Sequence, residues 1–189
     1  MLTLKGNIKT SGGSASDITV TVYGKKVQSG TYNANFQSLK SGKTNSSGNF
    51  SIEIEKENIS EYKIVVSKNK YFTIEDIFYS GSFTDDVFSK NYNLYLSADL
   101  TIIVKNDSPN DDDDYFKYKI TSGYIDAVGS CSEIQVFDGT NIDEEYNCKV
   151  IGSQDVVFEW IKIKNGNKYT GNKSIYSDTD SDNLIEFYY

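Results

Sequence analysis

The chain has 189 residues and carries 19 lysines and arginines against 27 aspartates and glutamates, a net charge of −8. This charge opposes binding to phosphate backbones and anionic lipid surfaces, so we expect no nucleic-acid partner. Histidine is absent, which excludes Ser-His-Asp and Cys-His nucleophile systems and imidazole-based zinc sites.

Without histidine, catalysis would need paired carboxylates, lysine or tyrosine chemistry, or a cation held by oxygen ligands. None of these leaves a distinct signature in the sequence. We therefore predict a non-catalytic protein with no cofactor and no catalytic, cofactor-binding or metal-binding residues. An enzyme that uses two carboxylates stays open as an alternative, and it would need Asp or Glu pairs about 5–10 Å apart in a cleft.

The composition favours strands, because aromatic residues make up 14% of the chain while proline and methionine occur once each. Apolar residues alternate with polar ones in short segments bounded by Gly, Ser, Asn and Lys, a pattern typical of half-buried strands. Residues 59–63 and 74–78 could each hold a helical turn, but neither segment is long enough for a substantial helix. In the first half the predicted strands are residues 2–8, 18–23, 50–54, 62–66 and 92–96.

The alternation also predicts which side chains of the first half face the core. The expected inward set is Phe50, Ile52, Ile54, Ile64 and Val66. Ser51 and Glu53, which lie between members of this set, should then be exposed.

The segment at residues 44–50, together with the strands on either side of it, resembles part of a known family. Gly6 in a first strand, a Gly/Ser loop and the strand at residues 18–23 precede it, and the strand at residues 62–67 follows it. This order resembles the carboxypeptidase-regulatory-like family. Its Thr-(Asn/Asp)-x-x-Gly-x-(Phe/Tyr) element is matched by Thr44, Asn45, Gly48 and Phe50.

The resemblance covers about half of the chain and implies a seven-stranded transthyretin-like sandwich of Greek-key type for residues 1–96. The element would form a tight turn with a permissive glycine and deliver an aromatic ring into the core. The chain departs from the family at residues 25–39, which are longer than the usual connection and lack its proline. Family members are accessory or spacer modules of secreted and envelope proteins, and they offer no catalytic residues to transfer.

A second domain is predicted at residues 97–189, where a fresh strand follows without a Gly/Ser or Pro linker. The whole chain is therefore expected to be all-β, with two consecutive antiparallel β-sandwich domains, the second of no recognised family. Asn165-Gly166 predicts a type I′ hairpin turn. The predicted strands are residues 100–104, 115–120, 133–137, 147–151, 156–164, 168–170 and 184–188.

Two acidic segments are candidates for calcium. Residues 107–114 hold four adjacent aspartates, which we interpret as a solvated loop. Asp178, Asp180 and Asp182 have the alternate spacing of a calcium loop, but Asn183 and Tyr189 stand where a helix-loop-helix site needs glycine and glutamate. We expect no tight calcium binding.

Aromatic residues near the C-terminus could form a sugar-stacking platform, although core packing is the favoured interpretation. The candidates are Trp160, Tyr169, Tyr176 and the terminal Phe187, Tyr188 and Tyr189. Trp160 shares a face with Val156 and Phe158, and Lys162 and Lys164 continue the same parity. That change from apolar to charged predicts either a strand end that leaves the core or a bulge that shifts the register.

Cys131 and Cys148 are the only cysteines. In an oxidising compartment they would be the only intramolecular pair, and they flank the turn-rich residues 138–145, which could return one strand beside its neighbour. Two reduced thiols are the alternative, because spacing alone does not show proximity.

These observations favour a non-catalytic structural or interaction module in the cell envelope or outside the cell, with a protein or glycan partner at the surface. The alternatives are a carbohydrate-binding accessory protein and a calcium-dependent adhesin. No apolar run approaches the ~20 residues that span a bilayer. No signal peptide is recognisable, so we expect that an export signal, and a lipid anchor if there is one, lie outside this sequence.

Overall fold

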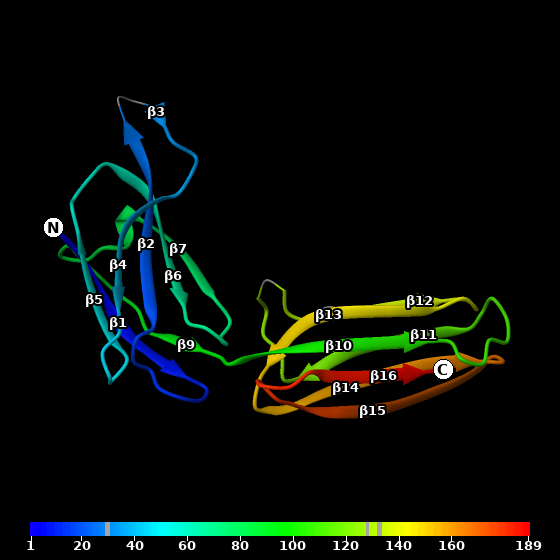
Figure 1. The fold of residues 1–189 in the computed structure, drawn as a ribbon. Coiled ribbons are helices and arrows are strands. Elements are labelled where there is room, and N and C mark those ends of the chain that lie inside the picture. Colours follow the sequence, from blue (N-terminus) through cyan, green and yellow to red (C-terminus); the bar gives the residue numbers. More distant parts are fainter. Residues whose placement is uncertain (29–30, 128, 132–133) are drawn as a thin grey trace. The chain divides into compact units, whose positions relative to one another are not determined.

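The computed structural model describes residues 1–28, 31–127, 129–131 and 134–189, and their regular structure is almost entirely β (Figure 1). The exception is one short 3₁₀ helix, η1 (Ser80–Ser82). The chain divides into two compact units, Met1–Tyr95 and Leu96–Tyr189. No helix among the described residues is long and apolar enough to cross a membrane. The chain is thus all-β, as predicted.

The first unit packs two sheets against each other. One has the order β5-β1-β8, with β9 also paired to β1, and the other has the order β3-β2-β6-β7, with β4 also paired to β2. The strands are β1 (Leu2–Thr10), β2 (Thr19–Gln28), β3 (Thr31–Tyr32), β4 (Gln37–Lys43), β5 (Asn49–Ile54), β6 (Ile59–Ser67), β7 (Ile74–Tyr79), β8 (Val87–Ser89) and β9 (Tyr92–Leu94).

The core of this unit confirms the predicted inward faces. All five members of the expected set are buried: Phe50, Ile52, Ile54, Ile64 and Val66. Ser51 and Glu53 are exposed between them. The register of β5 against β1, with Leu4 opposite Ile52, therefore places alternate side chains of both strands between the sheets.

The turn before β5 shows why its residue types are needed. Thr44 is buried, and its hydroxyl accepts from the Ile18 N–H at 3.0 Å and donates to the Ala15 carbonyl at 2.6 Å. Asn45 closes the turn by accepting the N–H groups of Ser47 and Asn49 at 3.0 Å each. Each polar side chain thus replaces a backbone partner that the turn removes.

Gly48 completes the turn at a φ of 78°, in the region that favours glycine. A Cβ at this position would lie 2.3 Å from the backbone oxygen of Ile8. Phe50, two residues later, packs its ring against Tyr92 with centroids 6.4 Å apart. The expected turn, with its glycine and its buried aromatic, is therefore present.

Two details of this unit differ from the sequence expectation. Residues 59–63 and 74–78 form parts of β6 and β7 rather than helical turns. The short apolar spacing of these residues fits either conformation. They form strands because β6 pairs with β2 and β7 in antiparallel fashion, and this pairing supplies the backbone hydrogen-bond partners. In addition, β1 pairs in parallel with β8 and β9, an exception to the antiparallel pattern.

The second unit is also a pair of sheets, with the orders β13-β10-β16 and β12-β11-β14-β15. Its first and last strands, β10 and β16, pair in parallel. The strand predicted at residues 168–170 is part of a longer strand, residues 167–177. Residue 133, the first of the strand predicted at residues 133–137, lies outside the described residues. The strands are β10 (Ser97–Lys105), β11 (Tyr115–Ser122), β12 (Gln135–Asp138), β13 (Asp143–Ile151), β14 (Gln154–Lys164), β15 (Asn167–Ser177) and β16 (Asn183–Tyr188).

The β14–β15 hairpin confirms the predicted turn. Asn165 and Gly166 have φ values of 50° and 70°, as a type I′ turn requires, and Lys164 pairs with Asn167 on either side of them. The pairing of β14 is regular from Phe158 to the turn on both sides. Of the two alternatives for Lys162 and Lys164, a strand end that leaves the apolar core is therefore the correct one.

A disulfide joins Cys131 to Cys148, with Cα atoms 5.3 Å apart. Cys148 lies on β13, and Cys131 lies in the loop before β12, where its N–H donates to the Lys149 carbonyl at 3.0 Å. The expected return of one strand beside its neighbour across residues 138–145 is wrong, because β12 pairs with β11 and β13 pairs with β10. The bond thus ties the loop before an edge strand of one sheet to an edge strand of the other.

Candidate functional site

The aromatic candidates do not form one flat row. Phe187 and Tyr189 are buried in the core of the second unit, and Trp160 packs against that core. Tyr169 and Tyr176 are exposed on β15, but their odd separation along a regularly paired strand places them on opposite faces. Core packing, the favoured interpretation, accounts for the buried members of the set.

The loop before β16 is organised by an asparagine. The Asn183 side chain accepts from the Asp178 N–H at 2.8 Å and donates to the carbonyls of Asp178, Asp99 and Ser181. One carboxylate oxygen of Asp178 accepts the Asp180 N–H at 2.9 Å. Among the described residues no three acidic or cysteine side chains gather as a metal site would require. Weak calcium affinity stays a prediction.

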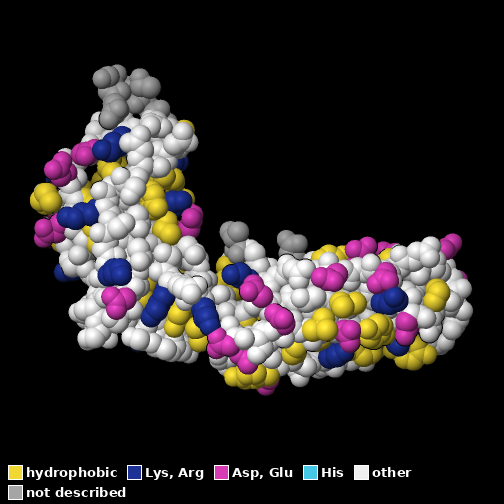
Figure 2. All heavy atoms as spheres, viewed as in Figure 1, with side chains coloured by type: hydrophobic (Ala, Val, Ile, Leu, Met, Phe, Trp, Pro, Cys, Tyr) yellow, Lys and Arg dark blue, Asp and Glu magenta, His cyan; other side chains and the backbone are white. Residues whose placement is uncertain are grey.

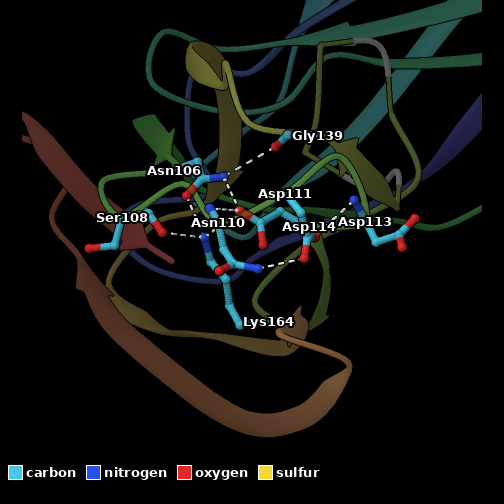
Figure 3. Close-up of polar contacts among 8 residues, drawn as sticks. All are labelled: Asn106, Ser108, Asn110, Asp111, Asp113, Asp114, Gly139 and Lys164. Carbon is cyan, nitrogen blue, oxygen red and sulfur yellow. Dashed lines mark hydrogen bonds and ion pairs between the residues drawn. The ribbon is translucent and has the colours of Figure 1, made fainter.

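The other acidic segment contains a buried polar cluster, which we call the Lys164 cluster: Asn106, Asp114 and Lys164 (Figure 3). The prediction that residues 107–114 form a solvated loop is wrong for Asp114, because this residue is only 1% exposed. A carboxylate can be buried here because a lysine on another strand supplies both a counter-charge and a hydrogen bond.

Three element ends bring the cluster together. Asn106 directly follows β10, Asp114 directly precedes β11, and Lys164 is the last residue of β14. The Asn106 N–H donates to the Ile142 carbonyl at 3.0 Å, which holds the end of β10 in place. Since β10 belongs to one sheet and β11 and β14 to the other, the cluster connects the two sheets at one end of the sandwich.

The contacts within the cluster are short and mutual. Lys164 Nζ donates to Asn106 Oδ1 at 2.6 Å and to Asp114 Oδ2 at 2.7 Å. Asn106 Nδ2 donates to the same Asp114 Oδ2 at 2.9 Å and to the Gly139 carbonyl at 3.2 Å. One carboxylate oxygen therefore lies within hydrogen-bond distance of both side-chain nitrogens.

The surrounding loop adds two further contacts. The Asn110 N–H donates to Asp114 Oδ2 at 2.9 Å, and Lys164 Nζ donates to the Ser108 carbonyl at 2.9 Å. Figure 3 shows Asn106, Ser108 and Asp114 around the Lys164 side chain. Three acceptors, Asn106 Oδ1, the Ser108 carbonyl and Asp114 Oδ2, thus face one ammonium group.

The electrostatics favour a charged carboxylate. Burial alone would raise the pKa of Asp114, but the hydrogen bonds from Lys164, Asn106 and the Asn110 N–H, together with the Lys164 charge, hold that pKa at about 2. Asp114 Oδ1 is buried and has no hydrogen-bond partner among the described residues. The ion pair is the resting state, with one carboxylate oxygen satisfied and the other unpaired.

Tyr189 forms the apolar wall of the cluster. Lys164 Nζ lies 5.1 Å from the centroid of its ring, a cation–π distance. Burial first, and then the charges of Asp114 and Asp138, raise the pKa of Tyr189 to about 12. The Lys164 cluster is therefore shielded from water on this side by a neutral aromatic ring.

Sequence reasoning did not find this cluster. One signal was present: Lys164 has the inward parity of Val156, Phe158 and Trp160, and a lysine on a core-facing position needs a buried partner. The partner was not predictable, because Asp114 lies 50 residues away and looked like one of four equivalent aspartates.

The surface of the molecule shows no segregation of charge on the face drawn. Figure 2 shows acidic and basic side chains interspersed over both units. The cavity beside the disulfide, about 440 Å³ in volume, is lined by Tyr118, Asp126, Gln135 and Tyr146 among others.

Comparisons with known proteins place the chain in no family. No family model matches it, and no curated protein matches it. Among solved structures, the shaft pilin spaA of Lactobacillus rhamnosus GG is similar at 10% identity, over 99% of this chain and 97% of that chain, with a TM-score of 0.37. The minor pilin GBS52 of Streptococcus agalactiae is 7% identical, over 100% of this chain and 95% of that chain, with a TM-score of 0.33.

A third similar structure is an enzyme. The gamma-CGTase of an alkalophilic Bacillus clarkii is 13% identical, over 89% of this chain and 23% of that chain, with a TM-score of 0.32. TM-scores this low establish neither a shared fold nor a shared function for this chain.

Proposed function

We propose that this chain is a non-catalytic structural or interaction module of a cell-surface or envelope protein. The observation that carries the proposal is the disulfide between Cys131 and Cys148. Disulfides of this kind persist in oxidising compartments and are rare in the reducing cytosol. The chain therefore fits a location outside the cytoplasm.

The architecture supports the structural part of the proposal. Each unit has its own hydrophobic core, and the second unit is further held by the disulfide and by the Lys164 cluster. Covalent and ionic ties between sheets resist separation of the strands. We infer that the second unit serves as a mechanically robust spacer or platform, with a protein partner at the surface.

For the first unit we propose membership of the carboxypeptidase-regulatory-like family. The support is the turn formed by Thr44, Asn45 and Gly48, which satisfies its own backbone groups and delivers Phe50 to the core. Accessory modules of that family occur in secreted and envelope proteins, which agrees with the location inferred from the disulfide.

The test is surface accessibility in the organism that encodes the chain. Intact cells would be treated with a protease, and the released peptides compared with those of a cytoplasmic control protein. At the same time, alkylation before lysis would report the state of Cys131 and Cys148. We expect released peptides from this chain and oxidised cysteines. Protection from the protease in intact cells, together with two alkylated thiols, would contradict the proposal.

A further inference from the structure

The Lys164 cluster places a nucleophile, an electrophile and a proton carrier within reach of one another. Lys164 Nζ is 2.6 Å from the carboxamide oxygen of Asn106, so the amine lies beside the carboxamide carbon. Asp114 Oδ2 is 2.7 Å from Lys164 Nζ and 2.9 Å from Asn106 Nδ2. We propose that Lys164 and Asn106 become joined by an intramolecular amide bond, with Asp114 carrying the proton between them.

The reaction balances with groups that the cluster itself contains. A proton passes from the Lys164 ammonium to Asp114, which leaves a neutral amine and a neutral acid. The amine attacks Asn106 Cγ and forms the new C–N bond. Asp114 then delivers its proton to Nδ2, the Cγ–Nδ2 bond breaks, and ammonia leaves. The nitrogen of the new bond still carries one surplus proton, which the departing ammonia takes up to become ammonium. A lysine ammonium and an asparagine carboxamide are thus converted to one secondary amide and one ammonium ion, and Asp114 is regenerated.

Asp114 can carry the proton because one of its carboxylate oxygens contacts both Lys164 Nζ and Asn106 Nδ2. A proton carrier must reach the nitrogen that gives the proton and the nitrogen that receives it. Asp114 Oδ2 contacts both without movement of the side chain, and its other oxygen is occupied by no hydrogen bond among the described residues. No external oxidant, metal or cofactor enters the balance.

Burial keeps water away from the reacting groups. The Lys164 side chain is 13% exposed and that of Asp114 is 0% exposed, so both charges have lost most of their hydration. Burial by itself acts against the charged form of Asp114, and the hydrogen bonds and the charge of its partners outweigh this effect and lower its pKa. The ion pair remains the resting state, and the reaction proceeds through the less populated neutral pair. Holding the two reactants in contact supplies the effective concentration.

An exposed lysine in the same unit gives a comparison. Lys105 Nζ contacts Asp143 at 2.8 Å, but the two side chains are 44% and 69% exposed. Water hydrates both of those groups and offers them other partners. Burial of the Lys164 cluster is therefore the feature that distinguishes it from an ordinary ion pair.

The bond would have a definite place in the fold. It would tie the end of β10 to the end of β14, which belong to opposite sheets and lie 58 residues apart in sequence. The disulfide ties the sheets near Leu100, because Cys148 pairs with that residue on β10. The second unit would then carry one covalent link at the end of β10 and one beside the middle of this strand.

The experiment is intact-mass measurement of the purified full chain, followed by peptide mapping. We expect a mass lower than that of the sequence, with its disulfide, by one molecule of ammonia. Digestion should yield one branched peptide that contains both Asn106 and Lys164. This second readout is needed because Asn165-Gly166 could lose ammonia by cyclising to a succinimide, which would not join two peptides.

Three variants and one control variant sharpen the test. Asn106→Asp should form the same bond with loss of water in place of ammonia. Lys164→Arg keeps the positive charge and should show the full mass, and Asp114→Asn should slow or abolish the reaction. Asp113→Asn, on the exposed part of the same loop, is the matched control and should react like the original chain.

The wild-type measurement decides the proposal even if a variant fails to fold. Full mass for the folded chain, with Asn106 and Lys164 recovered in separate peptides after prolonged incubation, would overturn it. A branched peptide that persists in Lys164→Arg would also overturn it, because the lysine would then not be the nucleophile.

Discussion

Gly171 lies directly opposite Trp160 in the pairing of β14 with β15, and a Cβ at position 171 would come 2.5 Å from the edge of the indole ring. The ring lies over the glycine, where any larger residue would displace it. Trp160 is the only tryptophan in the chain, so its fluorescence reports on this contact and on the second unit.

The first prediction follows from that contact. Gly171→Ala should destabilise the second unit by about 1–3 kcal/mol, the usual cost of overpacking, because the rigid indole must move. The measurement is denaturant unfolding followed by Trp160 fluorescence. Asn172→Ala, at the exposed neighbouring position on β15, is the control and should change the unfolding free energy of the second unit little. Equal effects of the two substitutions would contradict the prediction.

The second prediction concerns the turn before β5. Gly48→Ala should destabilise the first unit by at least about 2 kcal/mol, because it combines a positive φ with a Cβ placed 2.3 Å from the Ile8 carbonyl oxygen. Gly166→Ala shares the positive φ but has no atom within 4 Å of the added Cβ, so it measures the backbone strain alone. Calorimetry of both variants should show the larger loss for Gly48→Ala.

The third prediction compares two neighbouring aspartates. Asp114→Ala should destabilise the second unit by at least about 3 kcal/mol, because it leaves the buried Lys164 ammonium without its counter-charge. Asp113→Ala, at an exposed position one residue earlier, should stay within about 0.5 kcal/mol of the original chain. Similar stabilities for the two variants would show that the cluster contributes little.

The fourth prediction is the acid dependence of the ion pair. It is best measured in Asn106→Ala, which keeps Lys164 and Asp114 but cannot form the amide bond. In the original chain the hydrogen bonds and charge of its partners outweigh burial and lower the pKa of Asp114 to about 2; in the variant the hydrogen bonds from Lys164 and the Asn110 N–H and the Lys164 charge still lower this pKa, by less. A lowered pKa contributes stability above the unfolded-state value near 4, and this contribution is lost as the pH falls below about 4 through the folded-state pKa. Adding Asp114→Asn should flatten this part of the stability curve, and an unchanged slope would contradict the prediction.

The fifth prediction concerns the disulfide. Replacing both cysteines, by Cys131→Ser with Cys148→Ser, should lower the stability of the second unit by about 3 kcal/mol, the chain-entropy value for a loop of this length, 17 residues. Thermal unfolding followed by Trp160 fluorescence measures the change. Adding reductant to the original chain should reproduce the loss, whereas reductant should leave the double variant unaffected.

Several local features could be predicted from the sequence. Period-two alternation is a property of the strand itself, so the inward faces of β5 and β6 followed from Phe50, Ile52, Ile64 and their neighbours. The hairpin at Asn165-Gly166 and the turn at Gly48 were predictable for a similar reason, because their residue types satisfy a backbone requirement within a few residues.

Other local patterns were ambiguous without their neighbours. The apolar spacing of residues 59–63 and 74–78 suits a helical turn as well as a strand, and the pairing of β6 and β7 decided it. The parallel pairs β1–β8 and β10–β16 join segments far apart in the chain, and no local signal specifies which edge of a sheet the last strand occupies.

The Lys164 cluster separates what the sequence predicts from what depends on the tertiary structure. The sequence by itself determined that Lys164 continues the inward face of β14, because alternation assigns each side chain to a face. Only the packing of the two sheets decided that this position meets Asn106 and Asp114, which are 58 and 50 residues away. The physical reason is that hydrogen bonds and ion pairs act over a few ångströms, so a polar site exists only after the fold has brought its parts together.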